Sequence, residues 1–222
     1  MAFPVIKTKK EAEAVVYGLS KPGKMPGPAW GLNADACHRG ARMAKVAGSI
    51  CSRCYAQKGN YTRTPAPKQA QDRRLAAFTR AERRLWVAAM VRMIKGQKAF
   101  RWFDSGDLQS PEMLVAIVEV AHLTPETDHW LASREIVYIR LALAMLGAPL
   151  PPNIVIRVSA DFTGQKPVNR VTPWSSTVHD AKDPSTIVPG AFICPAPQQK
   201  NQCGSCRACW DRDVPLVSYK DH

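Results

Sequence analysis

The feature that most constrains the fold is a regular alternation of short apolar segments and longer amphipathic segments between residues 99 and 161. Residues 99–104, 129–133 and 153–159 are short and rich in aromatic or β-branched side chains, which predicts three strands. The segments between them have the apolar spacing of helices. Strand, helix, strand, helix, strand with short connections is typical of a parallel sheet, so we expect an α/β protein.

Start and stop signals place the predicted helices. Residues 110–112, Ser-Pro-Glu, combine a hydroxyl N-cap, a proline in the first position and an acid in the first turn. Ser133 is expected to cap a helix over residues 134–146. Apolar residues spaced by three, four and seven also predict a helix over residues 67–95, ended by Gly96.

Polar residues follow each of the three predicted strands where it ends. In parallel sheets, functional groups gather at the carboxyl ends of the strands, which lie along one edge. An acid in such a place can also cap the next helix, but three polar strand ends in succession favour a shared site. The candidate site residues are Asp104, Ser105, Gly106, Asp107, Gln109, Ser133, Arg134, Glu135, Ser159 and Asp161.

Positive charge is concentrated in one part of the chain. The whole chain of 222 residues has a formal net charge of +13. Residues 39–101 contain 16 Lys and Arg but only two acids, Asp72 and Glu82, so this stretch carries nearly all of the excess. A localised basic region is typical of proteins that bind a phosphate backbone, although a solvated helix face can have the same composition. The expected nucleic-acid-binding residues are Arg63, Arg73, Arg74, Arg80, Arg83 and Arg84.

Seven cysteines fall into two groups, which favours metal binding over disulfides in an intracellular protein. The second group, Cys194, Cys203, Cys206 and Cys209, offers four thiolates. Four thiolates satisfy either a tetrahedral zinc ion or a 4Fe-4S cluster, and the spacing leaves both open. We expect this group to fasten an irregular C-terminal segment.

The first group, Cys37, Cys51 and Cys54, offers three thiolates inside the basic stretch. Three protein ligands leave one coordination position open, as in catalytic metal sites. His38 is a possible fourth ligand, and a buried trio without metal is the alternative. Any ligand of this group would lie near the anionic partner.

Composition excludes several classes of protein. Apolar residues make up 45% of the chain, which is typical of globular proteins. We find no run of about 18 apolar residues and no secretory signal, so we expect no membrane partner and a cytoplasmic location. We expect one α/β domain over residues 1–222 whose parallel sheet forms a compact or partial (β/α) barrel with Cys-rich metal-binding segments. Its parts would be a cysteine-containing loop region (1–65), a βα core (66–161) and an irregular metal-binding segment (162–222).

Several motifs resemble known families. Residues 104–109, Asp-Ser-Gly-Asp-Leu-Gln, resemble the Asp-Ser-Gly-Gly-Phe-Gln motif of tRNA-guanine transglycosylases, which are (β/α)₈ barrels with a Cys-rich zinc site. The whole chain is more similar to phage DpdA-type 7-deazaguanine DNA transglycosylases. That similarity rests on Lys-Met-Pro-Gly-Pro-Ala-Trp at residues 24–30, Cys-Ser-Arg-Cys-Tyr at 51–55, residues 101–107 and the cysteines of residues 194–210. The Cys-x-x-Cys-Tyr motif also resembles radical-SAM-like iron–sulfur proteins, whose cluster uses three cysteines and leaves one iron open.

The transglycosylase resemblance implies exchange of guanine in phage DNA for a free 7-deazaguanine base, through a covalent glycosyl–enzyme intermediate. Asp104 matches the purine-recognising, proton-handling acid of the motif. From its position on a later strand, Asp161 is the candidate nucleophile, with Asp107 as its substitute. Ser105 and Gln109 would bond the planar base, and Gly106 would let it approach the backbone.

Two alternatives stay open. The first is a radical-SAM-like iron–sulfur enzyme that acts on nucleic acid, with a 4Fe-4S cluster in place of zinc. The second is a non-catalytic DNA-binding protein stapled by metal. A phage-encoded protein would work in the cytoplasm of the host cell. The oligomeric state is left open by the sequence.

Overall fold

One parallel sheet organises the structure, a computed structural model that describes residues 4–168 and 170–221. Within these residues seven strands pair in the order β1-β2-β3-β4-β5-β7-β6, and each neighbouring pair is parallel. The sheet is open, which is consistent with a partial barrel. The strands are β1 (Ala29–Trp30), β2 (Ala99–Trp102), β3 (Asp128–Ser133), β4 (Ile154–Ser159), β5 (Ser175–His179), β6 (Phe192–Ile193) and β7 (Leu216–Lys220).

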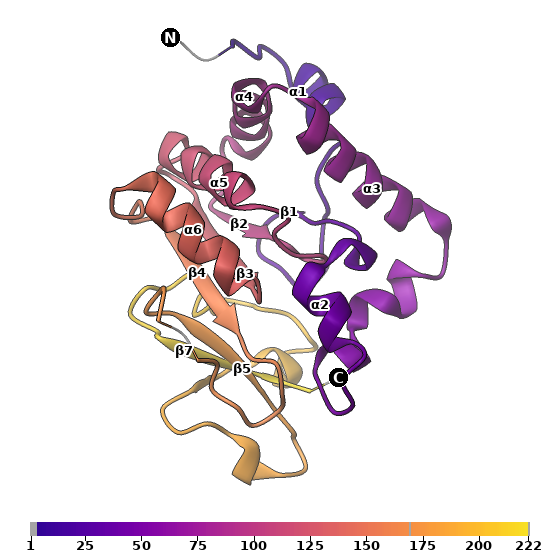
Figure 1. Cartoon of the computed structure of the whole chain (residues 1–222), viewed down its shortest axis with the longest axis vertical. Helices are drawn as coiled ribbons and strands as arrows, with labels where there is room; N and C mark the ends of the chain where they lie inside the picture. Colours follow the sequence, from indigo (N-terminus) through magenta and orange to yellow (C-terminus); the bar gives the residue numbers. More distant parts are fainter. Residues whose placement is uncertain (1–3, 169, 222) are drawn as a thin grey trace.

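Helices connect the first four strands, and α4, α5 and α6 line up along one side of the sheet in Figure 1. Their apolar sides form one core with the facing side chains of β2, β3 and β4. The helices are α1 (Lys9–Val16), α2 (His38–Met43), α3 (Pro65–Arg80), α4 (Arg83–Ile94), α5 (Pro111–Leu123) and α6 (Ile136–Leu146). The α/β prediction is therefore confirmed.

The predicted helix over residues 67–95 is in fact two helices. Ala81 has an extended backbone, and the carboxylate of Glu82 accepts hydrogen bonds from the backbone N–H groups of Arg84 and Leu85, which caps α4. Both helices turn apolar residues towards the same core, so the apolar spacing runs on through the break. Periodicity does not register the extended backbone at Ala81 or the cap at Glu82, which separate the two helices.

The helix start at Ser110 is confirmed, because its hydroxyl accepts a hydrogen bond from the N–H of Met113 at 3.3 Å. Ser133 behaves differently from the prediction. Its hydroxyl accepts from the N–H of Glu135 at 3.0 Å, but α6 begins only at Ile136. Ser133 therefore orders the strand end before the helix rather than capping the helix itself.

Residues after 161, expected to be irregular, contribute β5, β6 and β7 to the sheet. The expectation failed because β5 reads Ser-Ser-Thr-Val-His and has no apolar run. Its buried hydroxyls bond to other segments of the chain: Thr177 donates to the carbonyl of Gln165 at 2.5 Å, and Ser176 to Ser159 at 3.1 Å. Likewise, β1 lies within residues 1–65, which were expected to form a loop region.

The face of the sheet opposite the helices is covered by the C-terminal segment. Strand side chains alternate between faces, so Arg101, Trp130 and Arg157 point away from the helices. Trp210 packs edge-on against Trp130, with ring centroids 5.1 Å apart. The fully buried Arg157 donates to the carbonyl oxygen of Cys209 at 3.0 Å. The second cysteine group is thereby held against the sheet.

Across the described residues, no helix is both long and apolar enough to cross a bilayer.

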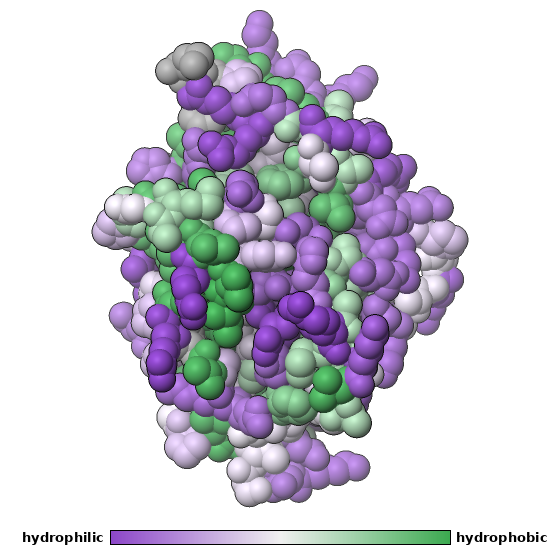
Figure 2. Space-filling view, viewed as in Figure 1, coloured by the Kyte–Doolittle hydropathy of each residue, from purple (hydrophilic) through white to green (hydrophobic). Residues whose placement is uncertain are grey.

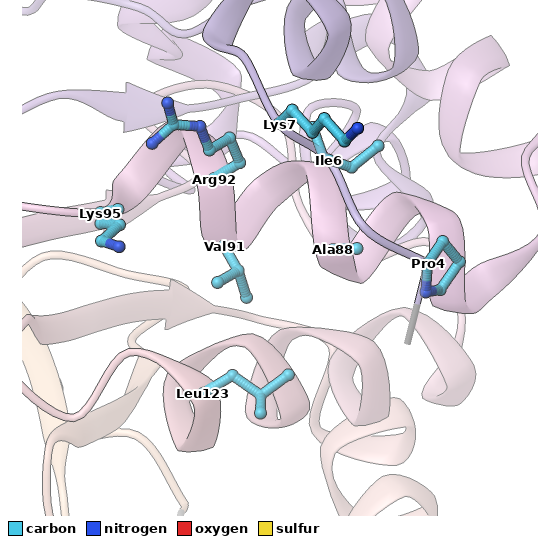
Figure 3. A pocket seen from close by; sticks show the side chains of 8 residues that line it. All are labelled: Pro4, Ile6, Lys7, Ala88, Val91, Arg92, Lys95 and Leu123. Atoms are coloured by element: carbon cyan, nitrogen blue, oxygen red, sulfur yellow. The ribbon is translucent and has the colours of Figure 1, made fainter. Parts of the chain in front are cut away.

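A groove lies away from the carboxyl ends of the strands. It has a volume of about 450 Å³ and separates the N-terminal segment from α4 and α5, and Figure 3 shows its lining. It includes Leu123 and Lys95, at the C-terminal ends of their helices, so the groove lies at the opposite edge of the sheet from the candidate site.

Candidate functional site at the carboxyl edge of the sheet

Asp107 joins the ends of β2 and β3. Its carboxylate accepts a hydrogen bond from the hydroxyl of Ser133 at 2.5 Å, from the backbone N–H of Arg134 at 2.9 Å and from the N–H of Leu108 at 2.8 Å. Gln109 donates from its side-chain amide to the backbone carbonyl of Asp107 at 2.8 Å. The predicted gathering of strand-end residues is therefore present for these two strands.

The carboxyl group of Asp107 is buried, and burial raises its pKa to about 6 despite the hydrogen bonds that favour the ionised form. A carboxyl group with this pKa changes its protonation state just below neutral pH. It can therefore give a proton to, or take one from, a group bound at the strand ends.

Because the pKa of Asp107 is raised in the folded protein, we expect the stability of the protein to depend on pH. In the unfolded chain the pKa returns to near 3.8, so the folded state binds the proton more tightly. The free energy of unfolding is therefore expected to fall as pH rises from about 4 to about 6. The total loss is about 3 kcal/mol and is complete above pH 6. The Asp107→Asn variant lacks this titration. Urea unfolding of both proteins from about pH 4 to pH 7 should show wild type losing stability relative to the variant; parallel curves would contradict the assignment.

Arg39, a residue that the sequence did not single out, links two of the predicted acids. Its backbone N–H donates to Glu135 at 2.6 Å, and its guanidinium pairs with Asp161 at 2.5 Å. Arg134 also approaches Asp161, with its Nε 3.9 Å from a carboxylate oxygen. Because Arg39 belongs to α2, these acids anchor the cysteine-containing segment over the strand ends. The one signal in the sequence that could have pointed to Arg39 was its position two residues after Cys37.

Asp104 lies apart from this cluster. It is buried, its Oδ1 lies so close to Gly31 that a β-carbon there would be 2.1 Å away, and Oδ1 makes no hydrogen bond. The neighbouring Ser105 hydroxyl is also buried without a partner. Tyr55 and Tyr61 donate to the backbone carbonyl of Asp104, at 2.5 and 3.3 Å. Among the described residues, no hydrogen bond or ion pair joins Asp104 to Asp107 or Asp161.

Gly106 is required for a different reason from the predicted approach of a base. Its φ is +75°, and a β-carbon would lie 2.7 Å from Leu32, so the neighbouring chain segment occupies that space. Phe103 also has a left-handed backbone, with φ of 57°, although it is buried. The turn between β2 and Asp107 is therefore tightly constrained, and it is the packing around it that holds this shape.

The three cysteines of the first group gather over the same edge. A β-carbon at Gly40 would lie 3.5 Å from the sulfur of Cys37 and 3.8 Å from that of Cys51, so both sulfurs face one small space. Burial raises the pKa of the Cys37 thiol well above its usual range, and the negative charges of Asp107 and Cys54 add to the rise. The group therefore lies within electrostatic reach of the buried carboxyl.

His38, the possible fourth ligand, has an exposed side chain whose ring packs edge-on against Tyr138. The backbone after α2 is fixed to the segment that follows β4, because the N–H of Ile50 donates to the carbonyl of Asp161 at 2.8 Å. The cysteine segment is thus tied to the sheet from both of its sides.

The second cysteine group lies on the far side of the sheet from the helices. Cys194 follows β6, and the sulfur of Cys209 contacts the hydroxyl of Tyr219 at 3.2 Å. Burial raises the pKa of Cys203, and the charges of Cys194 and Cys206 raise it further, so these thiols are neighbours. Within residues 4–168 and 170–221, no three His, Cys, Asp or Glu side chains are arranged to hold a metal ion. Metal binding by both groups stays a prediction.

The predicted nucleic-acid-binding arginines do not share one environment. Arg63, Arg73, Arg80 and Arg83 are exposed, and Arg84 is half-buried. Arg74 is buried instead and donates to the hydroxyl of Ser20 at 2.9 Å, which joins α3 to the loop before β1. Its guanidinium is turned inwards because Arg74 falls on the core side of α3.

These features define an α/β protein with an open parallel sheet and a buried carboxyl cluster at its carboxyl edge, overlaid by a three-cysteine segment. The family model of gene product 88 matches residues 6–212. The chain therefore belongs to the gene product 88 family. No curated protein and no solved structure matches it.

Proposed function

We propose that this protein is an iron–sulfur enzyme that acts on nucleic acid, in which Cys37, Cys51 and Cys54 hold a cluster with one iron free of protein ligands. The observation that carries the proposal is the place of the three-cysteine segment. It follows β1 directly and is anchored over the carboxyl ends of the strands, beside Asp107. Cofactors of parallel α/β proteins are bound at this edge.

A small space beside two of the three thiols supports the proposal. A side chain at residue 40 would fill the space between the sulfurs of Cys37 and Cys51, and Gly40 leaves that space empty. Thiolates are the usual ligands of iron–sulfur clusters, and three of them leave one iron open. With S-adenosylmethionine on the open iron, such a cluster supplies radical chemistry in the radical-SAM enzymes that the Cys-x-x-Cys-Tyr motif resembles.

The chain's own residues would hold the cysteine segment in place and transfer a proton. Arg39 holds the cysteine segment in place through Glu135 and Asp161. Asp107, with its pKa of about 6, would take up or release a proton at its carboxyl group, within electrostatic reach of Cys37. The packed turn at Gly106 keeps this carboxyl group fixed on the sheet.

The nucleic-acid part of the proposal rests on charge. Figure 2 shows hydrophilic side chains across the side of the molecule formed by α3 and by α2, which lies between Cys37 and Cys51. Arg73 and Arg80 on α3 are exposed and seven residues apart, so they share one helix face. Exposed arginines beside a strand-end site would hold phosphates without reading bases.

Replacing both Arg73 and Arg80 with alanine is expected to weaken DNA binding equally for all sequences. The slope of log K against log salt should become shallower by about 2, one unit for each lost phosphate contact. Fluorescence anisotropy with a labelled oligonucleotide at several salt concentrations measures both effects. Arg140→Ala, an exposed arginine on α6, is the matched control and should leave the slope unchanged. Equal slopes in all three proteins would refute the assignment.

Anaerobic reconstitution of the full chain with ferrous iron and sulfide tests the function itself. We expect bound iron and a brown protein whose visible absorption is bleached by a one-electron reductant. Colourless protein that contains only zinc would overturn the proposal. DNA binding without bound iron, and without any reaction, would support a DNA-binding protein stapled by metal.

A second candidate function is the exchange of guanine in phage DNA for a free 7-deazaguanine, inside the host cell. One observation favours it: Arg134 joins two acids at one edge of the sheet. Its backbone N–H donates to the carboxylate of Asp107, and its Nε lies 3.9 Å from a carboxylate oxygen of Asp161. The reaction needs such a pair, one acid as nucleophile and one for proton transfer. Release of labelled guanine from DNA on addition of the free base would support exchange. If Asp161→Asn still forms a covalent DNA adduct, Asp161 is not the nucleophile.

A further inference from the structure

The side chain of Tyr55 is fixed at its hydroxyl end but remains exposed. The hydroxyl donates to the backbone carbonyl of Asp104 at 2.5 Å and accepts from the guanidinium of Arg101 at 3.3 Å. The ring of Tyr61 lies beside it, with the two ring centroids 5.9 Å apart. Tyr55 is nevertheless 40% exposed. These contacts therefore hold an aromatic ring in a defined position at the surface of the protein.

Tyr55 lies beside the candidate site. It follows Cys54 directly, and the carbonyl that holds its hydroxyl belongs to Asp104, two residues after the end of β2. Ligands of parallel α/β proteins bind at this edge of the sheet. The large aromatic side chains at the end of β2 and on β3 are buried, namely Trp102, Phe103 and Trp130. In contrast to these three, Tyr55 can meet a ligand without a rearrangement of the core.

The segment around Tyr55 is strongly basic. Residues 39–63 contain six Lys and Arg and no acid. Two of the six pair with acids from distant parts of the chain, Arg39 with Asp161 and Arg53 with Asp221. The other four are exposed, namely Arg42, Lys45, Lys58 and Arg63. Exposed cations without acids among them favour a polyanion as the ligand of this surface.

An exposed aromatic ring within a basic segment has the chemistry of a site for single strands. Proteins that bind single-stranded nucleic acid follow the backbone with cations and stack its bases on aromatic rings. Every base has a π-face, so one ring accepts any of the four bases. In a duplex the bases are stacked on each other, and a base must leave the stack before a side chain can cover its face. The combination therefore favours an unpaired base.

We propose that the ring of Tyr55 stacks on one unpaired base of a single-stranded nucleic acid, while Lys58 and Arg63 hold neighbouring phosphates. The inference rests on the nucleic-acid part of the proposed function, and it needs no metal. Because two hydrogen bonds already fix the end of the side chain, little conformational freedom is lost when the base binds. A base in this position lies at the carboxyl edge of the sheet, next to the candidate site.

The first test measures the affinity of the full chain, without added iron, for a labelled oligodeoxynucleotide and for its blunt duplex. Tyr55→Leu removes the ring and the hydroxyl, and Tyr55→Phe removes the hydroxyl alone. We expect Tyr55→Leu to bind the single strand about tenfold more weakly, with its salt slope and its duplex affinity unchanged, since stacking releases no counterions. Tyr55→Phe should bind nearly as wild type does.

The matched control is Tyr17→Leu, because Tyr17 is also exposed, at 47%, but follows α1, which lies apart from α2 in Figure 1. It should bind both probes as wild type does. Equal single-strand affinity in wild type and Tyr55→Leu would overturn the inference and leave the proposed function standing. An equal loss in Tyr55→Phe, or on the duplex, would also overturn it, because the ring would then not be the contact. A chain that binds no iron after reconstitution would refute the proposed cluster and leave this result unchanged.

A second measurement reports the contact directly. A single strand with 5-iodouracil in place of one thymine is irradiated in complex with the wild-type chain, and the cross-linked peptide is identified by mass spectrometry. Because an aromatic ring stacked on iodouracil becomes joined to it, we expect a cross-link at Tyr55 that is lost in Tyr55→Leu. Cross-links at other residues alone would overturn the inference.

Discussion

Replacement of Cys51 by alanine is expected to abolish binding of the proposed iron–sulfur cluster and, with it, any reaction that such a cluster would support. Cys51 shares one small space with Cys37, and its pKa is raised mainly by burial, with opposing effects from Arg134 and Cys54. A cluster held by three thiolates has no spare ligand, so loss of one leaves an incomplete site. Iron content and visible absorption after anaerobic reconstitution measure the effect directly.

Two further variants make this first prediction specific. His38→Ala should retain the iron, because the His38 ring is exposed and packs against Tyr138. Gly40→Ala keeps every thiol but adds a β-carbon 2.9 Å from that of Cys37, so it should reduce iron binding as well. Loss of iron in His38→Ala would make this histidine a fourth ligand and close the site. Full iron content in Cys51→Ala would contradict the site altogether.

Replacement of Arg157 by methionine is expected to cause the largest loss of stability. The buried guanidinium donates to the carbonyl oxygens of Ala208, Cys209, Asp211 and Ser175, at 2.7 to 3.3 Å. Methionine has a comparable length but no donor, so several buried carbonyls would lose their partners. Each unsatisfied group costs about 1–3 kcal/mol, and we expect a total loss of about 3–5 kcal/mol.

Urea unfolding of the full chain measures this second effect. Arg212→Met is the matched control, because Arg212 is exposed and, among the described residues, donates to one carbonyl, that of Pro151, while it stacks on Trp174. We expect its cost to be about 1 kcal/mol or less. In Arg157→Met the thiol of Cys209 should also react faster with a thiol reagent, because Arg157 holds that segment to the sheet. Similar stability losses in the two variants would show that the buried network contributes little.

The fold could be predicted from the sequence where the pattern is local. The segments at residues 128–133 and 154–159 form strands as their short, mainly apolar sequences predict, and Ser110 caps its helix as expected. β5 could not be predicted in this way, because its buried hydroxyls find partners on distant segments. Two helices were merged into one because periodicity does not register a cap such as Glu82.

The candidate site could be predicted only in part. Asp107 and Ser133 meet as the strand-end argument expects. The placement of Asp104 away from this pair depends on Gly31, a residue of another strand end that no motif marked. The pairing of Asp161 with Arg39 spans more than a hundred residues, so it depends on where the fold carries α2.

The sequence by itself determined the alternation of strands and helices, the polar strand ends and the spacing of the cysteines, because each depends on neighbouring residues and on backbone periodicity. Only the tertiary structure decided which of those groups meet. Packing of the segment after β1 over the carboxyl edge places three cysteines beside Asp107. Packing of the C-terminal segment on the other face brings Cys209 to Tyr219 and Trp210 to Trp130. Such meetings are contacts between distant parts of the chain, set by the balance of burial and hydrogen bonding over the whole fold.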